Sequence, residues 1–494
     1  MKRLTQTQEI EPYLRDASQF HGEAEGVVFP ESEKEISEFL REANAKKISV
    51  TVSGGKTGLT GAAVPQGGWV LSTEKLCQIY EIHKGTEAFN SWARVEPAIY
   101  LKDLNHLLEG DSLFYAPDPT GPKAFLGGTL ATNASGPNSF KYGATRLHIR
   151  RIRMVLADGE ILDLRRGQIF ASREGILEIP LVHRKIKIQI PHYQWPGVKH
   201  AGGYFAEPGM DALDLFIGSE GTLGVTTEIE VSLLSRPQEL LSYVVFFKTE
   251  EDSWRFADLV REASLKNRKT KDSLDLETRM IEYFDAGSLE FLRPNHSSIP
   301  REARACLFIE QESVAENKKK FSAEWHQLFE NQKGIVGIWE GETRDKQEQF
   351  RTFRSALPLA VREFLEKHGQ VKVGTDTSVP HERFEELMLF HRRSVEKLGI
   401  ANLTFGHMGE SHVHLNLLPK NKEEAEKARA FYPELVQKAF SLGGTFSAEH
   451  GVGKMKRCYL KQLFGPKAIE EMKAVKRAFD PNLILGRGNL FEIQ

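Results

Sequence analysis

Residues 50–61 constrain the chain most strongly, because a short run rich in β-branched residues leads straight into a loop almost free of large side chains. The stretch reads VTVSGGKTGLTG. Glycines permit positive φ angles and let consecutive N–H groups approach an anion closely, as phosphate-binding loops require. An ordinary glycine-rich surface turn would look the same, so both readings stay open on this segment alone.

The two commonest nucleotide motifs do not account for the loop. An ATP-binding P-loop needs glycine at position 50, where the chain has valine, ahead of Gly55, Lys56 and Thr57. No G-x-G-x-x-G fingerprint follows a predicted strand elsewhere. The loop therefore has to be identified from other parts of the chain.

Composition excludes several classes of protein. The 494 residues carry a net charge of -2 and are 40% hydrophobic, which is ordinary for a globular protein and gives no field that attracts nucleic acid. Three dispersed cysteines, Cys77, Cys306 and Cys458, favour neither a disulfide framework nor an iron–sulfur site. We find no signal peptide or membrane-spanning run and expect a cytoplasmic protein.

The hydrophobic pattern predicts an α+β organisation. Ser32 and Glu35 form a capping box before a helix, and strands are expected on both sides of that helix. Asp158-Gly159 between two apolar runs predicts a hairpin. From about Glu239, strands alternate with amphipathic helices, which predicts a helix-covered antiparallel sheet. We expect a first domain at 1–236, a second at 237–445, and a return to the first at 446–494.

Four further segments make the glycine loop specific. Residues 127–136 read GGTLATNASG and are followed by Lys141-Tyr142-Gly143, while residues 216–225 read FIGSEGTLGV. Both resemble FAD-binding stretches of flavoproteins of the vanillyl-alcohol oxidase type. Residues 406–416, GHMGESHVHLN, and 447–454, SAEHGVGK, resemble the active-site signatures of the branch with FAD-linked D-lactate dehydrogenases, glycolate oxidase flavin subunits and D-2-hydroxyglutarate dehydrogenases.

The resemblance implies a two-subdomain FAD-binding domain and a ferredoxin-like antiparallel-sheet cap domain. It also implies FAD contacts, which by position in this sequence are Ser53, Gly54, Gly55, Lys56, Thr57, Gly58, Leu59, Pro117, Gly127, Gly128, Thr129, Ala131, Thr132, Asn133, Gly136, Gly143, Glu220, Gly224, Val225 and Asn489. Lys56 replaces a usual small residue and is expected to add a countercharge to the pyrophosphate. Members of the wider superfamily with covalently bound flavin carry a histidine in this loop. This chain has none there, so the resemblance implies non-covalent FAD.

A polar strand face is expected in the second domain. His412, His414 and Asn416 alternate with apolar residues on a predicted strand, so they share one face. The resemblance implies His407, His414 and Glu449 as ligands of a divalent metal such as Zn or Mn, whose ligand preferences this set matches. A hydrogen-bonded histidine cluster without metal is the alternative. His412 replaces the usual asparagine and is counted among the candidate catalytic residues, as a supporting partner or an extra ligand.

The resemblance also implies the catalytic groups. His450 would be the general base for the hydroxyl proton while hydride leaves for flavin N5. Arg354 would bind the substrate carboxylate, although a solvated arginine on an amphipathic helix fits the pattern too. Lys372 is a second candidate contact. It lies two residues before the position of the lysine in hydroxyglutarate enzymes, where this chain has Gly374, and this disfavours hydroxyglutarate.

The expected activity is oxidation of a small D-2-hydroxy acid to the 2-oxo acid, with electrons passed to a quinone, cytochrome or electron-transfer flavoprotein. The alternative is an alkyl transferase, because Gly486-Arg487-Gly488-Asn489-Leu490 resembles alkylglycerone-phosphate synthases. A non-catalytic phosphate binder is the third hypothesis. Residues 166–199 form an extra segment, read as a hairpin or as a basic patch for a partner or the inner face of a membrane. A homodimer is also conceivable.

Overall fold

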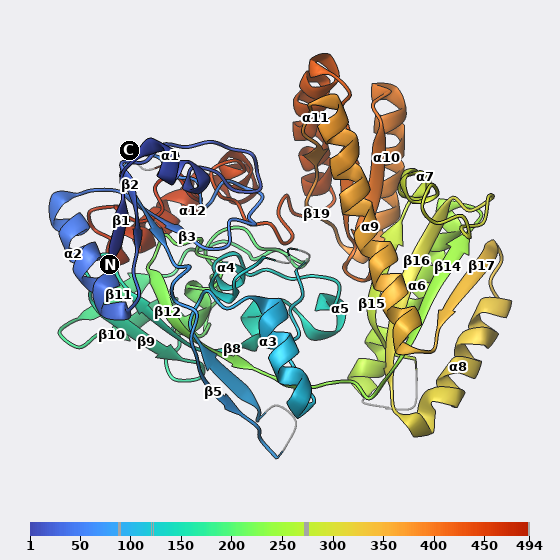
Figure 1. Ribbon diagram of the computed structural model, residues 1–494, viewed down its shortest axis with the longest axis horizontal. Coiled ribbons are helices and arrows are strands. Elements are labelled where there is room, and N and C mark those ends of the chain that lie inside the picture. The colour runs from blue at the N-terminus through green and yellow to red at the C-terminus, as the bar shows by residue number, and fades with distance from the viewer. Residues whose placement is uncertain (87–89, 120, 122, 271–275, 493–494) are drawn as a thin grey trace.

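The protein folds into two lobes that lie side by side. The computed structural model describes residues 1–494 except 87–89, 120, 122, 271–275 and 493–494. One lobe contains the elements up to β13 together with α12 (Arg457–Phe479), and the other contains the elements from β14 to α11 (Figure 1). None of the described helices combines the length and the apolar character that a bilayer crossing requires.

The first lobe begins with a small, mostly parallel sheet. Its strand order is β1 (Lys2–Leu4), β2 (Gly26–Phe29), β4 (Trp69–Ser72) and β3 (Val50–Ser53). Helix α2 (Glu33–Lys46) buries Ile36, Phe39 and Leu40 against this sheet. Its first turn is closed by the Ser32 hydroxyl, which accepts a bond from the Glu35 N–H at 3.3 Å. The Ser32 half of the capping box is confirmed, while the Glu35 side chain accepts from the Glu31 N–H in place of the Ser32 N–H. The order strand, helix, strand, glycine loop is confirmed.

A five-stranded antiparallel sheet forms the second layer of this lobe. Its order is β5 (Ile79–His83), β6 (Trp92–Val95), β12 (Val225–Ser232), β8 (Ile149–Val155) and β9 (Ile161–Arg165). Asp158 and Gly159 form the tight turn between β8 and β9, where the Asp158 carboxylate accepts a bond from the Glu160 N–H. The predicted hairpin is confirmed. Shorter elements complete the lobe: α1 (Thr7–Ile10), α3 (Leu101–Leu108), β7 (Leu113–Phe114), α4 (Leu126–Thr132), α5 (Ser139–Tyr142) and β13 (Leu234–Ser235).

The extra segment is a hairpin. Strands β10 (Ile176–Pro180) and β11 (Lys185–Gln189) pair antiparallel, and β11 contacts α12. Ile186 and Ile188 are buried, while Lys185 and Lys187 on the outer face both pair with Glu178. The hairpin reading is confirmed, and two of its lysines already have an acidic partner.

The second lobe is built on an eight-stranded sheet. Four strands run in the order β17 (Ile335–Gly341), β14 (Glu239–Phe247), β16 (Ala305–Ser313) and β15 (Thr278–Phe284), all antiparallel. With α6 (Glu250–Thr270) between β14 and β15, and α8 (Ala315–Glu330) between β16 and β17, this is the ferredoxin-like order. The α+β class and the ferredoxin-like cap sheet expected from the sequence are confirmed.

Helices cover both faces of this sheet because its strands are apolar on both faces. Val245 and Phe247 of β14 pack in the core with α6 and α8. Val244 and Phe246 point the other way, into a core with α7 (Ala286–Leu292) and α9 (Arg344–His368). In α9 the buried residues Phe350, Phe353, Leu357, Val361 and Leu365 recur at helical spacing, which leaves Arg354 on a neighbouring face.

The sheet continues on its β15 side with the strands that carry the histidines. These are β20 (Asn402–His407), β21 (His412–Leu417), β18 (Val373–Gly374) and β19 (Thr377–Ser378), with α10 (Phe384–Leu398) and α11 (Lys422–Ser441) nearby. β20 and β21 pair with His407 directly opposite His412. The two strands predicted around the Gly406–Ser411 turn are confirmed.

The end of the chain returns to the first lobe. The Val50 N–H donates to the Ile484 carbonyl at 2.7 Å, beside the glycine loop. The buried Lys476 ammonium in α12 contacts the Asp480 carboxylate and donates to the carbonyls of Thr222 and Leu485. These contacts fasten the last segment under the first lobe. The domain limits at residues 237 and 446 stay predictions.

Replacing Lys476 by methionine tests this fastening. The change leaves the buried Asp480 carboxylate without its cation, and breaking a buried pair in this way costs about 3–5 kcal/mol. We expect the urea midpoint of the FAD-free protein to fall accordingly. Lys473→Met, which removes the partner of the solvent-exposed Glu470 in the same helix, is the matched control and should shift the midpoint little. Equal midpoints for both variants would contradict the fastening.

Candidate active site

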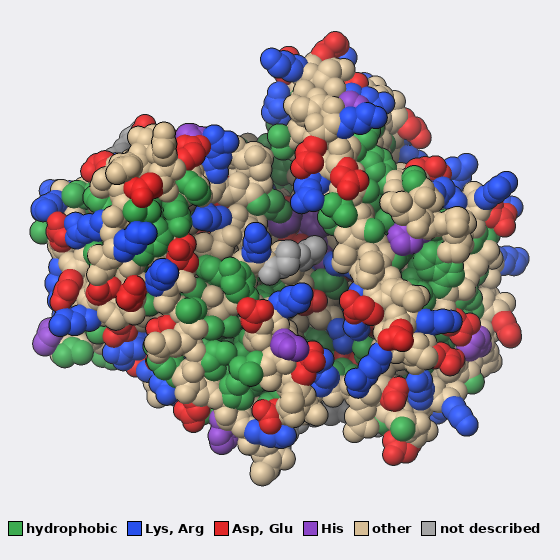
Figure 2. Space-filling view, viewed as in Figure 1, with side chains coloured by type: hydrophobic (Ala, Val, Ile, Leu, Met, Phe, Trp, Pro, Cys, Tyr) green, Lys and Arg blue, Asp and Glu red, His purple; other side chains and the backbone are tan. Residues whose placement is uncertain are grey.

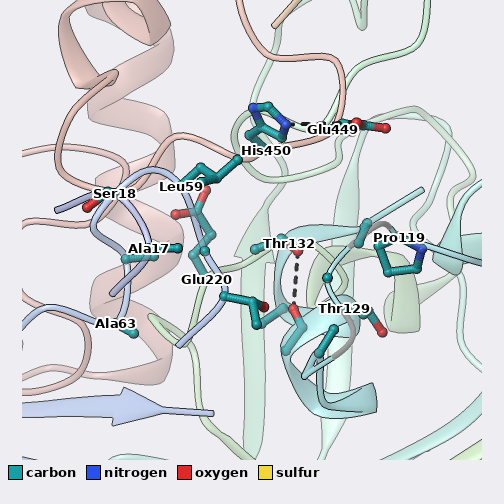
Figure 3. Close-up of a pocket in the computed structure, with 18 of the residues that line it drawn as sticks. Ala17, Ser18, Leu59, Ala63, Pro119, Thr129, Thr132, Glu220, Glu449 and His450 are labelled. Atoms are coloured by element: carbon teal, nitrogen blue, oxygen red, sulfur yellow. Dashed lines mark hydrogen bonds and ion pairs between the residues drawn. The ribbon is translucent and has the colours of Figure 1, made fainter. Parts of the chain in front are cut away.

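A large cavity separates the two lobes. Its volume is about 1110 Å³, and residues of both lobes line it. Figure 2 shows the hollow between the lobes, with histidine side chains visible inside it. Glu449 and His450 lie on one side, across from Thr129 and Thr132 of α4 (Figure 3). The described lining residues include thirteen of the twenty predicted FAD contacts: Gly54, Gly55, Lys56, Thr57, Gly58, Leu59, Gly127, Gly128, Thr129, Ala131, Thr132, Glu220 and Gly224.

The wall on the first lobe has the character of a dinucleotide cradle. A Cβ atom added to Gly55 would lie 2.2 Å from the Lys123 carbonyl oxygen, so this turn requires glycine. A Cβ added to Gly128 would meet no other atom within 4 Å, and this residue lines the cavity. Beside the loop, the buried Ser53 hydroxyl has no hydrogen-bond partner among the described residues. The glycine backbone of this wall and the open space beside Gly128 fit FAD.

The remaining predicted FAD contacts lie behind this wall. They are Ser53, Pro117, Asn133, Gly136, Gly143, Val225 and Asn489, and none of them lines the described cavity. Two glycines have structural reasons of their own. A Cβ on Gly136 would lie 2.0 Å from the Asp118 carbonyl oxygen, and Gly143 ends α5 with φ +76°.

Four other members of this group also have a place in the structure of the first lobe. The Asn133 side chain accepts a bond from the Arg146 N–H, and Asn489 bonds to the Lys454 ammonium and the Glu220 carbonyl. Pro117 and Val225 are buried, while their neighbours Pro119 and Thr226 line the cavity instead. The FAD motifs thus contain residues that shape the wall as well as residues that form its surface.

The Lys56 side chain does not point a free charge at the cavity. Its ammonium lies 4.0 Å from the centre of the Tyr13 ring, in a cation–π contact. Burial lowers the pKa of this lysine, and nearby Glu74 opposes that effect. The expected countercharge would require Lys56 to leave Tyr13, so the backbone of this residue, at φ +57°, is what the loop presents.

Three predicted metal ligands converge on the cap side of the cavity. His407 and His414 lie on the adjacent strands β20 and β21, and the Nε2 atom of each approaches Glu449 Oε1, at 3.2 and 3.3 Å. With His412 they form a group whose potential ligand atoms all lie within 4.8 Å of one another. Two imidazoles and a carboxylate fit a divalent cation such as Zn²⁺ or Mn²⁺.

The second oxygen of Glu449 is held by the first lobe. Lys199, which follows the β10–β11 hairpin, places its ammonium 3.1 Å from Oε2, and the Ser135 hydroxyl donates to the same oxygen at 3.0 Å. Burial opposes ionisation of Glu449, but Lys199 and His407 outweigh it and hold its pKa well below the usual range. Glu449 is therefore an anion that offers Oε1 to the histidines.

Asp376 organises the segment that carries Glu449 and His450. One carboxylate oxygen accepts from the Glu449 N–H and from His412 Nε2, and the other accepts from the His450 N–H and the Lys456 ammonium. His412 is fully buried and does not reach the cavity. Its contact with the Asp376 carboxylate fits the supporting role that the sequence offered for this residue.

His450 lines the cavity, and its surroundings favour the uncharged form of its ring. Its ring stacks on His414, with ring centres 5.1 Å apart and 6° between the planes. Burial lowers the pKa of His450 to about 4, although the Asp376 carboxylate opposes that shift, so the imidazole is uncharged at neutral pH. An uncharged imidazole can accept a proton.

Arg354 and Lys372 also reach the cavity. Arg354 Nε donates to Glu282 Oε2 at 2.8 Å, and its Nη groups make no hydrogen bond within the described residues. Lys372 donates to the Asn416 side chain at 2.8 Å, next to Gly374. The structure thus brings together His450, Arg354, Lys372 and the Glu449 cluster, as the sequence motifs implied.

Sequence reasoning missed Glu282, Lys199 and the role of Asp376. Glu282 lies 125 positions from its partner His407, and Lys199 lies 250 positions from Glu449. No local spacing links such residues. Asp376 stands in the stretch Asp376-Thr377-Ser378-Val379-Pro380, where a single carboxylate gives no sign of what it contacts.

Comparisons with known proteins agree with this geometry. Family models match at residues 24–165, for an FAD binding domain, and at 253–490, for the C-terminal domain of FAD linked oxidases. Glycolate oxidase subunit GlcD of Bacillus subtilis is 29% identical over 97% of this chain and 92% of its own length. D-lactate dehydrogenase of Archaeoglobus fulgidus is 30% identical over 94% of this chain and 90% of its own.

Solved structures bear on the fold alone. An alkyldihydroxyacetonephosphate synthase superposes with a TM-score of 0.66 over 95% of this chain and 77% of that chain, at 17% identity. The expected two-part architecture of an FAD-binding domain and a cap is confirmed by this likeness and by the two family models.

Replacing Gly128 by leucine tests the cradle. The added side chain would enter the open space beside Gly128 and exclude the cofactor while the fold stays intact. We expect the purified variant to lack the flavin absorption band and to bind added FAD at least about 100-fold more weakly, a loss of roughly 2.7 kcal/mol. Gly110→Leu is the control, since Gly110 also has open space around its Cβ position but does not line the cavity. Full flavin loading of Gly128→Leu would contradict this assignment.

Proposed function

Because the chain belongs to the family of FAD-linked oxidases, we propose that it oxidises a small D-2-hydroxy acid of the D-lactate type to the 2-oxo acid. The observation that supports this most is the cavity itself, with a glycine-lined wall facing His450, Arg354 and the Glu449 cluster. The printed names of the relatives, a glycolate oxidase subunit and a D-lactate dehydrogenase, support the same substrate class.

Residues 54–59 and 127–132 would hold FAD, mainly with main-chain groups. Bound FAD supplies the acceptor for the hydride that leaves the α-carbon of the acid. The glycine loop contains no histidine, so the proposal keeps the flavin non-covalent. Acid precipitation of the protein should therefore leave the flavin in the supernatant.

Arg354 would bind the substrate carboxylate. Its Nε group is already occupied by Glu282, which leaves the two Nη groups for a planar acid. A paired contact of this kind fixes the orientation of the acid as well as binding it. Lys372 is proposed as a second contact for the same end of the substrate.

His450 would accept the proton of the α-hydroxyl. The imidazole is uncharged at neutral pH and lies 3.5 Å from Asp376, which also holds its main-chain N–H. A base oriented by a third group is the arrangement that proton transfer requires. The proton can therefore leave the hydroxyl as the hydride leaves the adjacent carbon.

His407, His414 and Glu449 would hold a divalent cation. Such an ion supplies Lewis acidity toward a hydroxyl and a carboxylate oxygen. These residues suit that role because the Nε2 atoms of both histidines lie close to the same atom, Glu449 Oε1, at 3.2 and 3.3 Å. The His/Glu cluster also favours oxidation over alkyl transfer, which is supported by the short motif at residues 486–490 and by a likeness of fold.

The electron acceptor, location and assembly complete the proposal. We propose a quinone, a cytochrome or an electron-transfer flavoprotein as acceptor, and a cytoplasmic protein with at most peripheral contact to the inner face of a membrane. Homodimer formation stays a prediction. None of these choices affects the chemistry inside the cavity.

Anaerobic mixing with a panel of acids tests the proposed function. The FAD-loaded protein is mixed with D-lactate, L-lactate, glycolate, D-2-hydroxyglutarate and a longer D-2-hydroxy acid, and flavin bleaching is recorded. We expect a D acid with a short side chain to reduce the flavin fastest and L-lactate to leave it oxidised. Failure of every acid to bleach a fully loaded protein would contradict the proposal.

His450→Asn serves as the active-site variant in the same experiment. Loss of a general base slows the step by about 100- to 10,000-fold, whereas the FAD contacts are untouched. The variant should therefore retain full flavin loading and bleach far more slowly. Unchanged bleaching would remove His450 from this role.

A further inference from the structure

Glu282 is a buried carboxylate that touches two groups of the cavity without lining it. It lies on β15, directly opposite His407 of β20 in the strand register, and its exposed fraction is 1%. Oε1 lies 2.6 Å from His407 Nδ1, and Oε2 accepts from Arg354 Nε at 2.8 Å. One side chain thus joins a proposed cation ligand to the proposed carboxylate-binding group.

The contact with His407 determines which ring nitrogen faces the cluster. Because Nδ1 is directed to Glu282, Nε2 is directed to Glu449 Oε1, 3.2 Å away. A carboxylate behind a histidine ligand commonly fixes the orientation of the ring and strengthens the ligand.

The contact with Arg354 determines the plane of the guanidinium group. Phe353 and Leu357 are buried on the neighbouring face of α9, so the backbone of Arg354 is fixed by packing. The Nε bond to Glu282 then fixes the side chain. The two Nη groups make no hydrogen bond within the described residues, and Arg354 lines the cavity, so these groups are left for a ligand there.

We propose that Glu282 is a positioning residue that holds His407 and Arg354 in a common geometry, so that the cation and the substrate carboxylate bind in register. The inference rests on the proposed function, in which His407 is a cation ligand and Arg354 binds the acid. Glutamine cannot replace Glu282, because its amide places an NH₂ donor where the second carboxylate oxygen lies, so only one of the two partners keeps an acceptor.

The experiment uses FAD-loaded Glu282→Gln and two measurements that need no turnover. Calorimetry measures Mn²⁺ binding, and perturbation of the flavin spectrum by pyruvate measures binding of the 2-oxo acid. We expect Mn²⁺ affinity to fall about 10- to 100-fold, as for the loss of other residues behind a ligand. Pyruvate affinity should fall at least about 10-fold, since the Arg354 fork loses its anchor.

Glu310→Gln is the matched control. Glu310 is buried on the adjacent strand β16 and pairs with Arg279 and Arg351, but it neither lines the cavity nor contacts His407 or Arg354. Its replacement should lower the melting temperature while both affinities stay within about twofold of the unaltered protein. A fall in both affinities in this control as well would show a general effect of a buried charge and overturn the proposal.

Glu282→Asp covers the case in which the glutamine variant fails to load FAD. Aspartate keeps the negative charge, but its shorter side chain cannot reach both partners, so at least one affinity should fall. Affinities equal to those of the unaltered protein in either Glu282 variant would overturn the inference and leave the proposed function intact. Absence of Mn²⁺ and pyruvate binding in the unaltered protein would overturn both.

Discussion

The Glu449 carboxylate is the contact on which the rest of the site depends. Its Oε1 atom faces His407 and His414 from the cap sheet, and its Oε2 atom is held by Lys199 and Ser135 from the first lobe. A charge this deeply buried has to be compensated, and each partner comes from a different stretch of chain. The same interaction therefore sets the spacing between the glycine-lined wall and the imidazoles.

The first lobe and the cap present different kinds of surface to the cavity on the two sides of Glu449. The first lobe presents backbone and small side chains, which suit an elongated anionic cofactor and leave space for it. The cap presents histidine, arginine and lysine side chains on neighbouring strands and helices. Asp376 ties the segment after α11 to the cap through the N–H groups of Glu449 and His450, so one carboxylate holds both the base and the acidic ligand.

Local patterns predicted much of the fold, while the site needed contacts that no local pattern carries. The Ser32 cap, the Asp158-Gly159 hairpin and the paired histidine strands depend on neighbours a few residues apart. Glu282 and Lys199 gain their meaning only from partners brought close by the tertiary fold. Gly136 and Gly143 were predicted to contact FAD but do not line the cavity. A glycine required by backbone packing looks the same in the sequence as a glycine required by a ligand.

The central claim is that one cavity places a hydroxy acid against a bound flavin, with hydride leaving the α-carbon. Its most direct test is anaerobic rapid mixing with D-lactate and with D-lactate deuterated at C2, followed by the rate of flavin bleaching. The account predicts bleaching that is several-fold slower for the deuterated acid. Equal rates under conditions where substrate binding is saturated and flavin reduction is rate-limiting would contradict it.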